Sequence, residues 1–377
     1  MTDILFCSDF PLGYHNREAE RKLALLAERG YGAAYVAKLG IRDPGLRHAG
    51  EIARRLRHRH HHREPAAGPP PPFATCAPKL LPPRRAPGIA QLNRRWLARQ
   101  LLREVRDPAD TVVWLRFPTP ELVPFAERPE WPLVVYEVVD DHARSPGIDD
   151  RLRELLNAAE TRILARAGLV FAWSEPLAER LAARHANVHL ASAAADVDQF
   201  AAAASATRPQ AKVAAYAGSL DFRFDAPLVA AVARELADWR LRLAGPADPE
   251  VAAALAGLPN VELLGRVAPE TVPGLLASAS VCLMPYRETA FNDNLFPIKL
   301  IECLASGRPT VATGIRAARG LSDALAVASG AAGFAAAIRA AAEDPPGAAA
   351  RRQERAAPYS WSRRIDDMQA ALEAALP

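Results

Sequence analysis

Lys299 and Glu302 are the residues whose types and spacing point most clearly to chemistry. They lie three residues apart, on one face of a short predicted helix that begins near Pro297 and stops at Gly307. Proline suits the first turn of a helix, and glycine suits a left-handed cap at its end. A lysine near a helix N-terminus opposes the helix dipole unless an anion binds there as well. The segment therefore predicts a phosphate site.

A second group of chemically useful side chains follows a buried apolar run in the first half of the chain. Asp140, Asp141 and His142 come directly after residues 133–139. A carboxylate or imidazole at the end of a strand can take a proton from a hydroxyl group, as a general base does. Asp141 could equally cap the next turn, and His142 could simply be exposed.

Short apolar runs alternate with amphipathic stretches, which is typical of a parallel sheet covered by helices. The first series of predicted strands is 4–7, 33–36, 111–115, 133–139 and 169–173, and the second is 213–216, 240–243, 261–264, 281–284 and 310–312. An Ala/Pro/Gln stretch at 201–211 separates the series and is predicted to be a linker. Ligands of such sheets bind beyond the carboxyl ends of the strands, so both groups of polar residues stand where a site is expected.

Composition excludes several classes of protein. The 377 residues carry a formal net charge of +4 and four scattered cysteines, which favours two domains in a reducing cytoplasmic setting. We find no G-x-G-x-x-G or Walker sequence, no apolar run long enough to span a membrane and no aromatic platform for nucleic acid. The His/Arg/Pro-rich segment 54–72 is predicted to be a solvated basic loop, which leaves room for a peripheral contact with an anionic membrane.

Motifs in a fixed order along some 350 residues resemble those of GT-B nucleotide-sugar glycosyltransferases of the family 4 type, in the bacterial polysaccharide and teichuronic-acid-type branch. They are 135–141, 169–174, 194–200, 216–225, 260–265, the Pro-x-Lys-x-x-Glu helix at 297–302 and a terminal Trp-Ser-x-Arg helix. The resemblance implies two Rossmann-like, doubly wound α/β domains facing a central cleft. These would be residues 1–200 on the acceptor side and 212–359 on the nucleotide-sugar side, with a helix at 360–377 crossing back onto the first domain.

The same resemblance implies a donor site in the second domain. Lys299 would bind the diphosphate and Glu302 the ribose, whereas Ser219 stands where the family usually has an arginine. Asn294 replaces the glutamate that usually contacts the sugar, so the donor sugar cannot be named. The implied donor-site residues are Gly218, Ser219, Arg223, Gly245, Asn292, Asp293, Asn294, Pro297, Ile298, Lys299 and Glu302.

On the acceptor side, the resemblance assigns a substrate-contacting loop and a base. The loop residues are Asp9, Gly13, Asn16 and Arg17. Asp140 aligns with the catalytic aspartate of an inverting glucuronosyltransferase branch, while retaining members have a histidine nearby, which makes His142 the rival. The stereochemical outcome therefore stays open.

The sequence thus predicts a glycosyltransferase that moves a sugar from a nucleotide diphosphate sugar to a hydroxyl of a saccharide, lipid-linked or secondary-metabolite acceptor. The nucleotide sugar is a co-substrate; we expect no cofactor, no metal and no nucleic acid. The alternatives are a nucleotide-sugar epimerase of the same fold and a non-catalytic nucleotide- or glycan-binding relative. The oligomeric state is not predicted.

Overall fold

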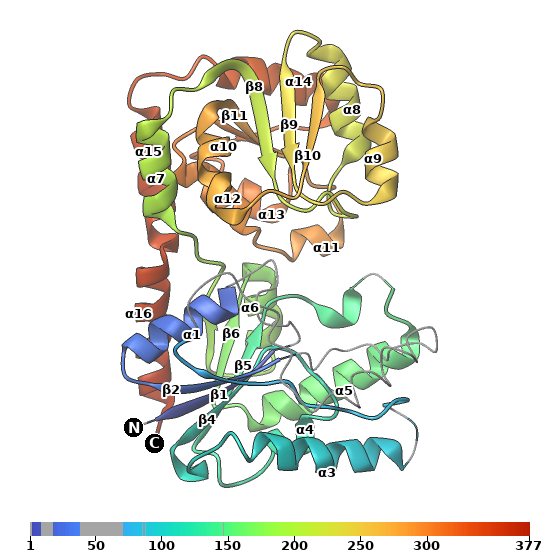
Figure 1. Cartoon of the computed structure of the whole chain (residues 1–377), viewed down its shortest axis with the longest axis vertical. Helices are drawn as coiled ribbons and strands as arrows, with labels where there is room; N and C mark the ends of the chain where they lie inside the picture. Colours follow the sequence, from blue (N-terminus) through green and yellow to red (C-terminus); the bar gives the residue numbers. More distant parts are fainter. Residues whose placement is uncertain (1, 9–17, 38–70, 85, 87, 146) are drawn as a thin grey trace. The chain divides into compact units, whose positions relative to one another are not determined.

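The structure is a computed structural model that describes residues 2–8, 18–37, 71–84, 86, 88–145 and 147–377. The chain divides into two compact units, residues 1–191 with 365–377, and residues 192–364. Each unit is built on one parallel sheet (Figure 1). The predicted α/β class with two parallel-sheet domains is confirmed.

Unit 1 has a seven-stranded parallel sheet in the order β3-β2-β1-β4-β5-β6-β7. Its strands are β1 (Asp3–Cys7), β2 (Gly32–Val36), β3 (Ala74–Cys76), β4 (Thr111–Leu115), β5 (Leu133–Val138), β6 (Leu169–Ala172) and β7 (Val188–Leu190). Its helices are α1 (Glu18–Glu28), α3 (Ile89–Leu101), α4 (Val123–Ala126), α5 (Asp150–Arg166), α6 (Glu175–Ala182) and, from Ile365 on, α16 (Trp361–Ala375). Every residue of β4 and β5 is buried, because helices cover both faces of a parallel sheet.

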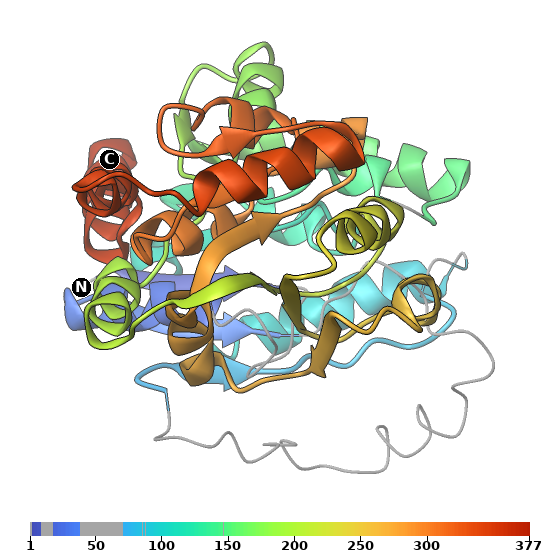
Figure 2. The same cartoon turned by 90° about the horizontal axis from the view of Figure 1, so that it is seen from above.

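Unit 2 has a six-stranded parallel sheet in the order β10-β9-β8-β11-β12-β13. Its strands are β8 (Gln210–Ala217), β9 (Arg240–Ala244), β10 (Val261–Gly265), β11 (Ala279–Met284), β12 (Thr310–Ala312) and β13 (Ala326–Val327). Two groups of helices pack together, α8 (Ala226–Glu235), α9 (Pro249–Leu255) and α14 (Gly330–Ala341) in one, and α7 (Val197–Ala206), α10 (Val272–Ser278), α12 (Ile298–Ala305) and α15 (Ala348–Ala356) in the other (Figure 1 and Figure 2). Two one-turn helices, α11 (Ala290–Asp293) and α13 (Arg316–Arg319), lie in loops.

The predicted linker, residues 201–211, is not an irregular segment between the two units. Residues 201–206 are the second half of α7, and β8 already begins at Gln210. The boundaries of the units fall at 191/192 and 364/365 instead of 200 and 360. Helix α3 and strands β3, β7 and β13 were not predicted.

A buried group of charges joins the strands of unit 1 to α1. Glu137, the next-to-last residue of β5, is completely buried and accepts hydrogen bonds from Lys22 and from the indoles of Trp114 (2.8 Å) and Trp173 (2.7 Å). Lys22 also pairs with Glu18 at 2.7 Å, as i and i+4 on α1. Arg116 and Glu18 lie 3.0 Å apart, so the group contains two cations and two carboxylates, all buried.

The environment of Glu137 sets its charge. Burial alone raises the pKa of this carboxyl, but Lys22, Arg116 and the hydrogen bonds lower it below the ordinary value of 4.5. Glu137 is therefore a buried carboxylate whose partners keep it ionised.

None of the helices in the described ranges is long and apolar enough to cross a membrane.

We expect Glu137→Ala to lower the free energy of unfolding of unit 1 by about 3–5 kcal/mol, because it leaves Lys22 and Arg116 buried without their shared carboxylate. Urea unfolding of the full chain would measure the loss. Asp150→Asn is the matched control: its carboxylate pairs with Arg153 but is 92% exposed, and we expect a change within about 0.5 kcal/mol.

The pH dependence tests the same assignment. The pKa of Glu137 is lower in the folded state than in the unfolded state, so its ionised carboxylate stabilises the protein fully above pH 4.5. This stabilisation is lost as the pH falls through the pKa of the folded state. The Glu137→Ala variant should therefore lose less stability between neutral and acid pH than the wild type does. Equal acid sensitivity of the two proteins would contradict a lowered pKa.

Candidate functional site

The ends of β8 and β9 meet the start of α12 at two glycines. Gly218 and Gly245 have φ of 155° and 141°, which side chains rarely adopt. A Cβ atom on Gly218 would lie 1.7 Å from Cε of Lys299, and one on Gly245 would lie 1.9 Å from the carbonyl oxygen of Gly218. The stem of Lys299 therefore packs directly on the backbone at the end of β8, where only glycine fits.

Helix α12 has the limits that its sequence predicts. It begins after Pro297, and Gly307 closes it with φ of 66°, while the Ser306 N–H bonds to the Glu302 carbonyl at 3.0 Å. Its first turn has neither an acidic residue nor a capping side chain. The N–H groups of Ile298 and Lys299 bond to no described residue, so this N-terminus offers free donors beside a lysine.

Lys299 and Glu302 are both partly buried, and neither side chain makes a hydrogen bond or ion pair with any residue in the described ranges. Burial raises the pKa of Glu302; the charge of Lys299 lowers it, and that of Asp196 raises it further. The helix thus carries a cation and a carboxyl that the fold itself does not satisfy.

Arg223 is less available for a ligand than its sequence position suggests. Its Nε donates to Asp221 at 3.0 Å, its Nη2 pairs with the same carboxylate, and its guanidinium lies 5.7 Å from the ring centre of Phe222. Burial raises the pKa of Asp221, but these bonds, with a contribution from Lys299, hold it below its usual range. The positive charge of Arg223 is already neutralised.

The loop predicted to contact the sugar is largely occupied with holding itself in place. The amide of Asn292 donates to the carbonyls of Arg223 (3.2 Å) and Arg287 (2.8 Å). Asp293 accepts from the Arg316 N–H at 2.8 Å, and Asn294 donates to the Ala290 carbonyl at 2.9 Å. These contacts fix the shape of the loop. Ser219, at the start of the loop after β8, is partly buried, and its carbonyl accepts from the Tyr216 hydroxyl at 3.0 Å.

In unit 1, Asp140, Asp141 and His142 differ in what surrounds them. Asp141 is 8% exposed and lies 3.5 Å from Nε of Arg144. The ring of His142 packs edge-on against Phe117, and its Nε2 is buried without a partner in the described ranges. The Asp140 side chain is partly exposed and makes no hydrogen bond or ion pair with a described residue. Of the three, Asp140 is therefore the one whose side chain is both accessible and free of partners in the described ranges.

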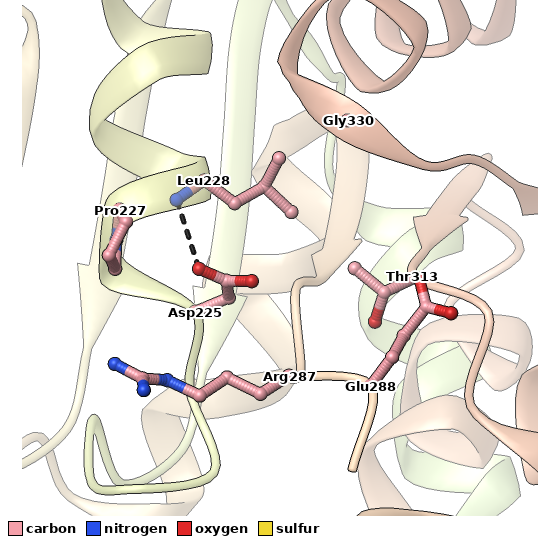
Figure 3. A pocket seen from close by; sticks show the side chains of 7 residues that line it. All are labelled: Asp225, Pro227, Leu228, Arg287, Glu288, Thr313 and Gly330. Carbon is pink, nitrogen blue, oxygen red and sulfur yellow. Dashed lines mark hydrogen bonds between the residues drawn. The ribbon is translucent and has the colours of Figure 1, made fainter.

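A cavity of about 430 Å³ in unit 2 was not predicted (Figure 3). It opens beyond the ends of β8, β11 and β12, beside the first residues of α8 and α14. Asp225 caps α8 by accepting from the Leu228 N–H at 3.0 Å, and Thr313 donates to the Tyr286 carbonyl at 2.5 Å. Its lining is Asp225, Pro227, Leu228, Arg287, Glu288, Thr313 and Gly330, none of them a predicted donor residue.

Some predicted positions fall outside the described residues, and some notable residues were missed. Asp9, Gly13, Asn16 and Arg17 lie outside the described ranges, as does most of segment 54–72. Glu137 was missed, although a charged residue inside an apolar strand is a recognisable signal for a buried pair. Across the described ranges, no three His, Cys, Asp or Glu side chains are grouped as metal ligands would be.

Residues 212–344, most of unit 2, match the family described as Glycosyl transferases group 1. The chain is also 27% identical over 221 residues to TuaH of Bacillus subtilis, named as a candidate teichuronic acid biosynthesis glycosyltransferase. That alignment covers 54% of this chain and 55% of TuaH, so the chain spans about half the length of this curated relative.

Solved structures match the fold over nearly the whole chain. Sucrose-phosphate synthase from Thermosynechococcus elongatus has a TM-score of 0.73 at 15% identity, covering 99% of each chain. Anabaena HepE in complex with UDP has a TM-score of 0.69 at 14% identity, covering 99% of this chain and all of HepE. Residues 212–344 therefore carry a domain of the group 1 glycosyl transferase family, and the whole chain shares the fold of these solved structures.

Lys299 and Glu302 lie inside the matched domain, together with every other predicted donor residue. The proposed base, Asp140, lies in unit 1, outside it.

We expect Glu302→Gln to raise the melting temperature at neutral pH. The pKa of its carboxyl is higher in the folded state than in the unfolded state, so the folded state holds the proton more tightly. Above pH 4.5, the pKa in the unfolded state, ionisation of this carboxyl therefore costs stability. At pH 4 the carboxyl is mostly protonated in both states, and the glutamine variant should nearly match the wild type. Calorimetry at pH 4 and pH 8 measures the difference. A glutamine variant that melts lower at pH 8 would show that the carboxylate stabilises the fold.

Proposed function

We propose that this chain transfers a sugar from a uridine diphosphate sugar to a hydroxyl acceptor. The observation that carries the proposal is the packing of Lys299 on Gly218 at a helix N-terminus with free N–H groups. Such an N-terminus binds phosphate, and a lysine beside it adds a full positive charge. Solved relatives of the same fold contain UDP or UDP-glucose, which supports uridine as the base.

In the proposed donor site, the diphosphate lies against Lys299 and the first turn of α12, and Glu302 accepts hydrogen bonds from the ribose hydroxyls. A bound ribose would supply the partner that Glu302 lacks in the protein. Arg223 would position the loop through Asp221 instead of holding phosphate itself.

In the proposed reaction, Asp140 takes the proton from the acceptor hydroxyl. The oxygen of that hydroxyl bonds to the anomeric carbon of the donor sugar at the same time. The bond from that carbon to the diphosphate oxygen breaks, and the electron pair leaves with UDP. Lys299 and the α12 N–H groups stabilise the negative charge that develops there. A saccharide of a bacterial surface polymer is the acceptor class that the similarity to TuaH supports. The same similarities favour transfer over the epimerase and the non-catalytic alternatives.

Lys299→Ala should weaken UDP binding about 10- to 100-fold, the scale of one lost charge-assisted hydrogen bond. Isothermal titration calorimetry measures it. The control is Lys212→Ala, an exposed lysine of the same unit that pairs with Asp238, and its affinity should equal that of the wild type. Unchanged binding by the Lys299 variant would refute the phosphate assignment.

Asp140→Asn should reduce turnover about 10²- to 10⁴-fold with UDP affinity unchanged, because an amide cannot take the proton. The assay follows UDP release from UDP-glucose with and without a panel of saccharide acceptors. Asp150→Asn, an exposed carboxylate of the same unit, should retain full activity. If the Asp140→Asn variant turns over normally, the base is another residue. Conversion of the donor sugar without any acceptor would indicate an epimerase instead of a transferase.

A further inference from the structure

Helix α3 presents a stripe of basic and apolar side chains to solvent. Positions 92, 95, 96, 99 and 103 share one face at helical spacing, and Leu102 still bonds to the Ala98 carbonyl at 2.9 Å, so the helical path reaches Arg103. Leu92 is 51% exposed and Trp96 partly so. We call this stripe the α3 face; it consists of Leu92, Arg95, Trp96, Arg99 and Arg103, with Arg94 and Arg106 exposed beside it.

The opposite side of α3 is fixed to unit 1 by specific contacts. Leu97 and Leu101 are buried in the core. Asn93 bonds to both the N–H and the carbonyl of Leu81 at 2.8 Å, and Gln100 bonds to those of Lys79 at 2.9 and 3.1 Å. These contacts fix the rotation of α3, which lies along the outside of unit 1 (Figure 1), and the residues of the α3 face are exposed or partly exposed.

Charge pairing distinguishes this face from the rest of unit 1. Several other arginines of the unit pair with carboxylates, as in Arg29 with Asp366, Arg128 with Glu130 and Arg162 with Glu127. The five arginines of 94–106 make no ion pair or hydrogen bond with any described residue. Exposed arginines close together repel one another, and an anionic partner would relieve this repulsion.

We propose that the α3 face docks the protein on an anionic membrane surface. Arginines on this face would contact lipid phosphates, while Leu92 and Trp96 enter the boundary between head groups and acyl chains, where Trp is favoured. A soluble polyanion would match the charges but would leave no role for the exposed leucine. The inference does not rest on the proposed transfer reaction, because it concerns a different surface.

Co-sedimentation of the full chain with vesicles tests the proposal. We expect binding to vesicles of 30% phosphatidylglycerol in phosphatidylcholine, none to phosphatidylcholine alone, and weaker binding in 0.5 M than in 0.1 M NaCl. The triple variant Arg95→Gln/Arg99→Gln/Arg103→Gln should bind on the order of 100-fold more weakly, about fivefold for each arginine. Leu92→Ser/Trp96→Ala should weaken vesicle binding but not binding to soluble dextran sulfate.

The matched control is Arg234→Gln/Arg339→Gln/Arg351→Gln, which removes the same charge from exposed helix positions of unit 2. It should bind vesicles as the wild type does, and circular dichroism would verify that every variant is folded. Equal loss in the control would show that only net charge matters and would overturn the proposal. So would an α3-face variant that binds normally, or a wild type that binds dextran sulfate but no vesicle.

Discussion

A carboxylate without access to water, that of Glu137, holds together the carboxyl ends of the central strands in the sheet of unit 1. Glu137 accepts hydrogen bonds from residues of β4, α1 and the end of β6, so four elements share one buried charge. A buried ion costs several kcal/mol unless all its partners stay in place, so none of these elements can shift alone. Asp140 lies only three residues further along the same strand and loop. The loop proposed to supply the base therefore starts from a rigid point.

In unit 2, two glycines at the carboxyl ends of the strands play the part that a buried charge plays in unit 1. Gly218 and Gly245 let the ends of β8 and β9 come together and leave the surface on which the stem of Lys299 lies. The ammonium group is positioned by packing, so its charge needs no partner from the protein. Glu302, one turn further along α12, has a carboxyl with a raised pKa that burial makes costly to ionise. Ionised Glu302 therefore costs stability in the free protein, which is common where a fold is shaped for a ligand.

Local signals in the sequence were enough to predict most of the strands and α12, because apolar runs, Pro297 and Gly307 act within a few residues of themselves. The linker was mispredicted because its alanines were taken for flexible chain, whereas alanine is the strongest helix former and 197–206 folds as α7. Helix α3 depends on Asn93 and Gln100 bonding to backbone more than ten residues away. Likewise, residue spacing does not predict that Arg223 pairs with Asp221, or that the Asn292 amide donates hydrogen bonds to two carbonyls.

Most arginines and lysines on which the fold depends are matched by carboxylates or carbonyls. Arg352 binds Asp344 and the Gly307 carbonyl, and Arg308 binds the carbonyls of Ala277 and Thr207. Against this background, two kinds of cation without a partner in the described ranges are informative: the stem of Lys299 packs on Gly218, and Arg99 belongs to the fixed helix α3. A cation whose position is fixed before binding loses less conformational freedom when an anion binds, so less of the binding free energy is lost. That reasoning assigns a diphosphate to the end of α12 and lipid phosphates to the α3 face, from one physical argument applied to two separate surfaces.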